Sequence, residues 1–169
     1  MAADAHRGGT LKTFWGAMTD EELNRCLEHM HFAFRNLVRE PDRVLAKYGL
    51  GRAHHRALYC IAKRAPSVGE AAARLGVSHQ GFHKTMRDLI ERDLVRSHPD
   101  QANRRIRRLT LTPRGRRLEQ QINDIQRAMF ADVGKIVGTK RMAAWATVMD
   151  TLASQAPTRS SSRRARRSD

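Results

Sequence analysis

Five side chains at helical spacing are the first feature of this sequence that could bind a ligand. All of them can donate hydrogen bonds and none is acidic: His79, Gln80, His83, Lys84 and Arg87. On one face of a helix, side chains of these types contact base edges and phosphates in the major groove of DNA. Ser78 directly precedes the helix, caps it, and belongs to the same predicted DNA-binding set. The alternative is a polar face that is only solvated.

A cluster of arginines follows on a predicted β-hairpin. Its members at the tip and on the return strand are Arg104, Arg105, Arg107 and Arg108. From Arg74 to Arg117 there are twelve Lys or Arg against four Asp or Glu, a local excess of eight positive charges. This density favours contact with a phosphate backbone over a solvated basic hairpin. We predict that Arg104, Arg105 and Arg107 bind DNA.

The elements that position these side chains form a predicted helix-turn-helix. Ser67 and Glu70 have the spacing of a capping box, which begins a short helix. The order Ala72, Gly76, Phe82 provides a small residue for close helix packing, a glycine for the turn and an anchor for the second helix. The residues expected to be buried in this pair are Ala71 or Ala72, Leu75, Val77, Phe82, Met86, Leu89 and Ile90. The same pattern also fits an ordinary amphipathic helical hairpin.

The hairpin after the second helix is expected to be a wing. Residues 94–96 form its first strand, residues 98–103 turn, and residues 106–112 return with Leu109 and Leu111 facing inward. A wing directly after a helix-turn-helix strengthens the DNA-binding interpretation.

Long helices are expected on both sides of this segment. One begins after Thr19, and Pro41 ends or bends it; another spans residues 52–64, with Ala57, Leu58, Ile61 and Ala62 buried. Thr112-Pro113 begins a third helix that Gly138 closes, and a last helix starts near residue 140. Their apolar stripes are Leu23, Leu27, Met30, Phe34, Leu37 and Val38; Leu118, Ile122, Ile125, Met129, Val133 and Ile136; and Met142, Trp145, Val148, Met149 and Leu152.

The overall composition agrees with a DNA-binding protein. The 169 residues carry a net charge of +15, which favours a polyanionic partner. No stretch is apolar enough for a membrane helix, no signal peptide is evident, and two separated cysteines, Cys26 and Cys60, fit a reducing cytoplasm. We find no phosphate-binding glycine loop, nucleophile elbow or cluster of carboxylates, so an enzyme is not expected.

The order of these motifs resembles the MarR family of multiple-antibiotic-resistance-type regulators, over roughly residues 20–156. The residues that carry the resemblance are Ser67-Val-Gly-Glu-Ala-Ala-Ala-Arg-Leu-Gly-Val-Ser78, Leu89-Ile-Glu-Arg-Asp-Leu-Val95, Pro99-Asp100, Asn103-Arg104-Arg105 and Leu109-Thr-Leu-Thr-Pro-Arg-Gly115. The family implies a mainly α fold with a small β-wing, a winged helix-turn-helix joined to long N- and C-terminal dimerisation helices. It also implies a homodimer on a pseudo-palindromic operator, with Arg104 or Arg105 in or beside the minor groove.

The expected organisation has five parts. Residues 1–18 form a flexible arm, 19–48 an N-terminal dimerisation helix, 49–112 the DNA-binding lobe, 113–156 the C-terminal dimerisation helices, and 157–169 a disordered arginine-rich tail.

Three positions depart from the family pattern. The wing Asp that usually braces an arginine is Asn103, and Asp100 is expected to take over part of that bracing. Asp93 stands where a glycine is usual before Leu-Val. The Gly-Leu-Thr-x-x-Gln stretch of the family becomes Gly49-Leu-Gly-Arg-Ala-His54.

Relatives in this family often respond to phenolic or aromatic-carboxylate ligands, and no other cofactor is expected. The candidate lining for such an effector is His29, Phe32, His54, His55 and Arg56, which offers ring contacts and cationic donors. These residues could equally be surface polar groups, or one His could cap the preceding loop. Two further alternatives are a metal site where His29, His31, His54 and His55 converge, and a redox switch at Cys26 or Cys60, against the expectation of buried, inert thiols.

The sequence therefore predicts a cytoplasmic, homodimeric, sequence-specific transcriptional regulator, a repressor released by a small aromatic carboxylate. An architectural DNA-binding protein with little sequence preference is the alternative of a different class. A redox- or metal-responsive regulator would share the same fold.

Overall fold

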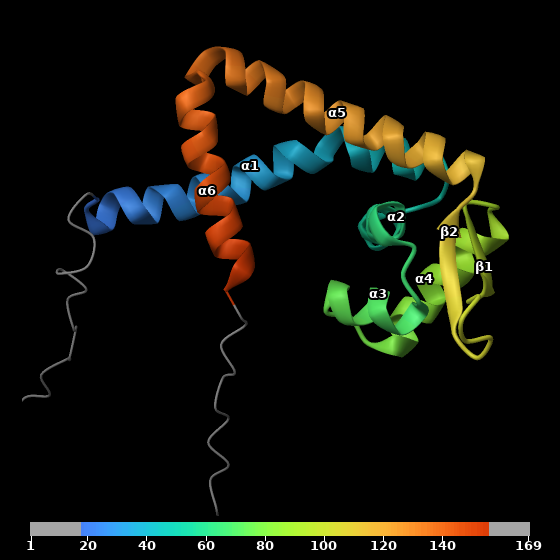
Figure 1. Cartoon of the computed structure of the whole chain (residues 1–169). Helices are drawn as coiled ribbons and strands as arrows, with labels where there is room; N and C mark the ends of the chain where they lie inside the picture. Colours follow the sequence, from blue (N-terminus) through green and yellow to red (C-terminus); the bar gives the residue numbers. More distant parts are fainter. Residues whose placement is uncertain (1–17, 156–169) are drawn as a thin grey trace, which may run out of the picture. The chain divides into compact units, whose positions relative to one another are not determined.

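The computed structural model describes residues 18–155, so the predicted N-terminal arm (apart from its last residue) and the arginine-rich tail lie outside the described residues. The chain divides after Arg127 into two compact units. The elements are α1 (Asp20–Ala46), α2 (Arg52–Arg64), α3 (Val68–Leu75), α4 (His79–Glu91), β1 (Val95–Pro99), β2 (Arg107–Leu111), α5 (Pro113–Val137) and α6 (Thr139–Ser154) (Figure 1). This is the predicted mainly α fold with a small β-wing. None of the described helices is both long and apolar enough to cross a membrane.

Helix α1 begins at a reciprocal capping box and continues through a proline. The Thr19 side chain accepts from the backbone N–H of Glu22, whose carboxylate accepts from the backbone N–H of Thr19. Pro41 does not end the helix, which runs on to Ala46. Proline removes one helical hydrogen bond, but Pro41 and Leu45 are buried, and their packing holds the last turns in place.

The first compact unit has one core, which is built from Leu45 of α1 and from every element from α2 to α5. Its buried members include Leu58, Ile61, Ala71, Ala72, Phe82, Met86, Leu89, Leu94, Val95, Leu109, Leu118 and Ile122. Gly76 makes the turn between α3 and α4 with φ 63°, as predicted. Three predictions of burial are wrong: Ala62, Val77 and Ile90 are exposed. Ala62 and Ile90 lie at the edges of their apolar helix faces, and Val77 lies in the turn between α3 and α4, so helical spacing does not decide which way these side chains face.

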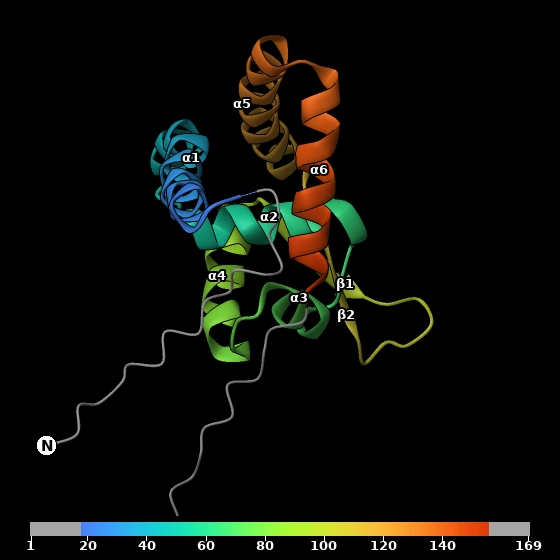
Figure 2. The ribbon, with the colours of Figure 1, turned by 90° about the vertical axis from the view of Figure 1, so that its left-hand side faces the viewer.

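The wing is a two-stranded antiparallel hairpin in which Val95 pairs with Leu111 and Pro99 with Arg107. Its loop extends away from helices α2–α4 (Figure 2). The strands differ from the predicted ranges, since β1 continues to Pro99, into the predicted turn. The Asp100 N–H donates to the Ile106 carbonyl (2.8 Å), and this hydrogen bond extends the ladder between the strands. Asp93 precedes β1 with φ 51°, the left-handed conformation in which glycine is usual.

The start of α5 is locked against the start of the wing. Thr112 is buried, and its hydroxyl donates to the Asp93 carbonyl (2.7 Å) and accepts from the Gly115 N–H (3.0 Å). Its own N–H donates to the Leu94 carbonyl (3.1 Å). A Cβ at Gly115 would overlap the Leu94 carbonyl oxygen and lie 2.9 Å from its carbon, so only glycine fits here.

Much of the apolar stripe on the long helices is exposed in the single chain. Leu27, Met30 and Phe34 of α1 and Trp145, Val148, Met149 and Leu152 of α6 are all exposed, and α6 has no buried residue. Within the second unit, the Phe130 and Trp145 rings lie 5.2 Å apart.

Candidate nucleic-acid interface

Helix α4 presents the predicted recognition face to solvent. Ser78 caps the helix by accepting from the Gly81 N–H (3.2 Å), and Phe82, Met86 and Leu89 are buried on the inner face. The five residues that the sequence indicates are all exposed: His79, Gln80, His83, Lys84 and Arg87. Since no acidic side chain interrupts these five positions, this face can approach a phosphate backbone without charge repulsion.

The loop of the wing holds two arginines free for a ligand. Arg104 and Arg105 are exposed, and neither forms an ion pair with any carboxylate within residues 18–155. The loop itself is ordered by Asp100, whose Oδ1 accepts from the N–H groups of Ala102 (2.9 Å) and Asn103 (3.0 Å). Asn103 Oδ1 in turn accepts from the Arg105 N–H (3.1 Å).

Arg108 fastens the wing to α3 and to its own loop, an arrangement we call the wing clasp (Glu70, Asp100 and Arg108). Its Nε donates to Asp100 Oδ2 and its Nη1 to Glu70 Oε2, each at 2.7 Å. The same Glu70 oxygen accepts from the Ser67 N–H (2.7 Å), so one carboxylate both caps α3 and binds the wing. The hydrogen bond from Arg108 holds the pKa of Asp100 below its usual value. Asp100 therefore does brace the wing where Asn103 cannot.

Arg107 has a different role from Arg104 and Arg105 of the loop. Its Nε donates to Ser97 Oγ (2.9 Å) and its Nη2 to the Ser97 carbonyl (2.6 Å), so its guanidinium links the two strands. It stays exposed, with donors left for a phosphate.

The five residues predicted to line an effector site have different surroundings in the structure. His29 and Phe32 are exposed on α1. His54 is bonded to Gly51 and Asp88, and Arg56 Nη2 donates to the Leu75 carbonyl (2.7 Å). His55 is half-buried, and this burial lowers its pKa.

The metal and redox alternatives depend on where the histidines and the two cysteines lie. No three His, Cys, Asp or Glu side chains within residues 18–155 converge as metal ligands. Cys60 is buried and its pKa is raised by burial, as expected of an inert thiol, whereas Cys26 is exposed in the single chain, contrary to expectation.

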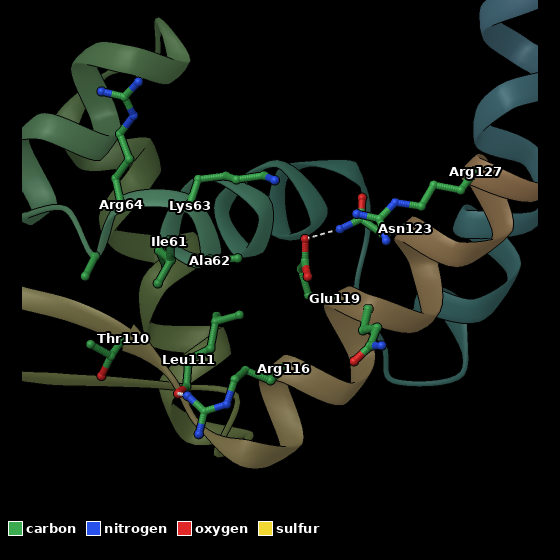
Figure 3. Close-up of a pocket in the computed structure, with 12 residues that line it drawn as sticks. Ile61, Ala62, Lys63, Arg64, Thr110, Leu111, Arg116, Glu119, Asn123 and Arg127 are labelled. Atoms are coloured by element: carbon green, nitrogen blue, oxygen red, sulfur yellow. Dashed lines mark hydrogen bonds between the residues drawn. The ribbon is translucent and has the colours of Figure 1, made fainter. Parts of the chain in front are cut away.

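A cavity of about 600 Å³ lies between the C-terminal end of α2, β2 and α5 (Figure 3). Ile61, Ala62 and Leu111 form apolar walls, and Glu119 is hydrogen-bonded to Asn123. Its other charged lining residues are all cationic: Lys63, Arg64, Arg116 and Arg127. Apolar walls with cationic groups suit a small organic anion.

Comparison with known proteins identifies the family. The chain is 34% identical over 154 residues to the HTH-type transcriptional regulator PetP of Rhodobacter capsulatus, covering 90% of each protein. A family model described as MarR family matches residues 48–106. The chain belongs to the MarR family. It is therefore a DNA-binding transcriptional regulator, in a family without enzymatic activity.

Solved MarR-family structures share the fold. Staphylococcus aureus MarR, solved in complex with salicylate and kanamycin, is 24% identical and superposes with a TM-score of 0.65, over 79% of this chain and 91% of that one. Streptococcus pneumoniae FabT, solved in complex with DNA, is 15% identical with a TM-score of 0.66, over 77% of this chain and 94% of that one.

The sequence indicates which basic side chains of this MarR-type lobe are exposed. It does not indicate the residues that orient them. On sequence alone, Arg108 is only a wing charge and Glu70 only a helix cap. The 38 residues between them carry no pattern that would pair them. Asp100 is the one member of the wing clasp that the sequence indicates.

Loss of the Arg108 side chain is expected to loosen the wing. Arg108→Ala removes both ion pairs, and we expect DNA affinity to fall by about three- to tenfold, since a disordered wing must be ordered on binding. Trypsin should also cut faster at Arg104 and Arg105. The control is Arg96→Ala, which removes an exposed arginine 3.8 Å from Asp93. Equal cleavage rates in the two variants would show that the clasp does not order the wing.

Proposed function

We propose that the protein is a homodimeric repressor that binds a pseudo-palindromic operator and is released by a small aromatic carboxylate. The observation that carries the proposal is the presence, on one compact lobe, of an exposed helix face without acids and a braced wing with two free arginines. In a two-fold dimer, two such lobes would contact successive major grooves. The proposed contacts are Ser78, His79, Gln80, His83, Lys84, Arg87, Arg104, Arg105 and Arg107.

The homodimer is supported by the unsatisfied apolar surface of the long helices. Phe34 of α1 is 53% exposed, Ile136 of α5 84% and Val148 of α6 55%. Side chains of this size on three helices form more apolar surface than a monomer usually leaves in water. Burying them against a second copy would recover about 25 cal/mol for each Å² removed from water.

The effector proposal is supported by the cavity between α2, β2 and α5. Its volume is in the range of small-molecule sites, and its four cations against one acid favour an anion. The salicylate held by S. aureus MarR is an aromatic carboxylate, which supports this class of ligand. His29, Phe32 and His55 remain the alternative lining, because His54 and Arg56 already have partners within the chain.

Release of the protein from DNA tests the proposal. We expect one member of a panel of aromatic carboxylates to dissociate the protein from its upstream DNA in a fluorescence-anisotropy titration. Ala62→Trp, which fills the cavity from an exposed position, should abolish release and leave DNA affinity within about twofold. In the same titration, His55→Gln tests whether the alternative lining is needed for release.

Two outcomes would change the proposal. Specific binding that is indifferent to every acid would exclude this effector class. Equal affinity for operator and random duplexes would favour an architectural protein instead.

A further inference from the structure

We infer that His54 positions the recognition helix through its neutral Nε2–H form, so that protonation of this imidazole weakens DNA binding. The inference rests on DNA binding alone and does not depend on an effector. It assigns to His54 a role other than ligand binding.

Both ring nitrogens of His54 have a partner. Nδ1 accepts from the Gly51 N–H at 3.0 Å, and Nε2 lies 3.1 Å from Asp88 Oδ2. A nitrogen that accepts an N–H carries no hydrogen of its own, so Nε2 must hold the proton and donate it to the carboxylate. The side chain is only 15% exposed, which leaves little room for another arrangement. Only the neutral Nε2–H tautomer satisfies both bonds.

One of these bonds caps the first turn of α2, and the other joins that turn to α4, which carries the recognition face. Gly51 is the N-cap residue of α2 and has no side chain to cap the helix, so the imidazole provides the cap. Asp88 follows Arg87 of the recognition face on α4. Arg92 reinforces the connection: its Nε donates to the Tyr48 carbonyl and its Nη1 to the Asp88 carbonyl, both at 3.1 Å. We call His54, Asp88 and Arg92 the helix clasp.

Protonation would disrupt one end of this clasp. A hydrogen on Nδ1 would point at the Gly51 N–H, placing two donors 3.0 Å apart. The bond to Asp88 would survive as an ion pair, so His54 would stay bonded to α4 while the first turn of α2 loses its cap bond at Gly51. The first turn of α2, to which α4 is bonded through His54, would then be held less firmly.

The charged groups around the clasp act in both directions. Asp88 stabilises an imidazolium, whereas Lys84 on α4, Arg92 at the C-cap of α4 and Arg52 on α2 oppose it. Asp42 of α1 is bonded to Arg52 at 2.9 Å, which reduces the effect of both. The hydrogen bond from His54 lowers the pKa of Asp88, so this carboxylate stays ionised across the range in which a histidine titrates.

Glutamine is the informative replacement for His54. At the third position of a helix its amide oxygen can accept from the N-cap N–H, as in a capping box, and its amide N–H₂ can donate to Asp88. Glutamine does not titrate. His54→Gln should therefore retain the clasp at every pH, whereas His54→Ala should lose it at every pH.

The experiment compares the DNA affinities of the wild-type protein and the His54→Gln variant from about pH 8 to about pH 5.5. At the upper end of this pH range we expect the two affinities to agree within about twofold. At the lower end we expect the wild type to bind about fivefold more weakly, because it has lost one hydrogen bond. His79 and His83 are present in both proteins, so their contribution cancels in the ratio. His31→Gln, the same change at an exposed histidine of α1, is the control and should follow the wild type. Parallel pH profiles of wild type and His54→Gln would overturn the inference.

A second measurement needs no variant. The ¹⁵N chemical shifts of the His54 ring in the intact protein distinguish the two tautomers. We expect a protonated Nε2 and a bare Nδ1 near pH 8. The opposite tautomer, or a rapid mixture of both, would overturn the inference even if His54→Gln failed to fold.

Discussion

Replacing Gly115 with alanine is expected to lower the free energy of unfolding by about 3 kcal/mol, the cost of forcing extra volume into a packed site. The added Cβ would overlap the Leu94 carbonyl oxygen. The backbone there cannot retreat easily, because the same carbonyl accepts from the Thr112 N–H and the Thr112 hydroxyl holds the Asp93 carbonyl. Urea denaturation at one fixed protein concentration measures the effect.

Gly134→Ala is the matched control for this prediction, because it makes the same change in the same helix. A Cβ at Gly134 meets only Met142 Cγ at 3.8 Å, an ordinary contact. Alanine is also the better helix former, so the control should be neutral or stabilising by up to about 1 kcal/mol. If both variants unfold at the wild-type midpoint, α5 does not pack tightly against Leu94.

Removing the two free arginines of the wing is expected to have the largest effect on DNA binding. The double variant Arg104→Ala/Arg105→Ala should weaken binding by about 100-fold, since each arginine is worth about 1–3 kcal/mol at a DNA contact. Its salt dependence should also flatten, because fewer counterions are released, by about 0.9 in slope for each phosphate that the variant no longer neutralises. Anisotropy titrations at several salt concentrations measure both quantities.

The control for charge alone is Arg39→Ala/Arg43→Ala, which removes two exposed arginines from α1. These arginines lie beside Glu40, with N–O distances of 3.8 and 2.7 Å. If net charge were the only cause, both double variants would weaken binding equally. Equal losses would therefore refute a direct role for the wing arginines.

Local signals predict the helices well because helix ends depend on neighbouring residues. The Ser67–Glu70 capping box, the turn at Gly76 and the Thr112-Pro113 start all occur where the sequence places them. Pro41 is the exception. A proline ends a helix on local grounds, and only the burial of Pro41 and Leu45 in the folded lobe explains why α1 continues.

The parts that could not be predicted depend on contacts between distant residues. His54 and Asp88 are 34 residues apart, and Arg108 and Glu70 are 38 apart. Residue type alone suggests that His54 could bind a ligand, but its orientation is decided by the approach of α4. The recognition face is predictable because it follows from helical periodicity; its support is not, because the support is tertiary.

The double use of Glu70 has a consequence for protein engineering and for evolution. A single oxygen accepts from the Ser67 N–H and from Arg108, so any change at Glu70 alters the start of α3 and the anchoring of the wing together. A wing transplanted from another regulator will not be anchored to α3 unless it has an arginine at the position of Arg108. The start of α3 and the wing therefore evolve together. Whether a substitution at Glu70 is tolerated depends on the residue present at position 108, and the reverse also holds.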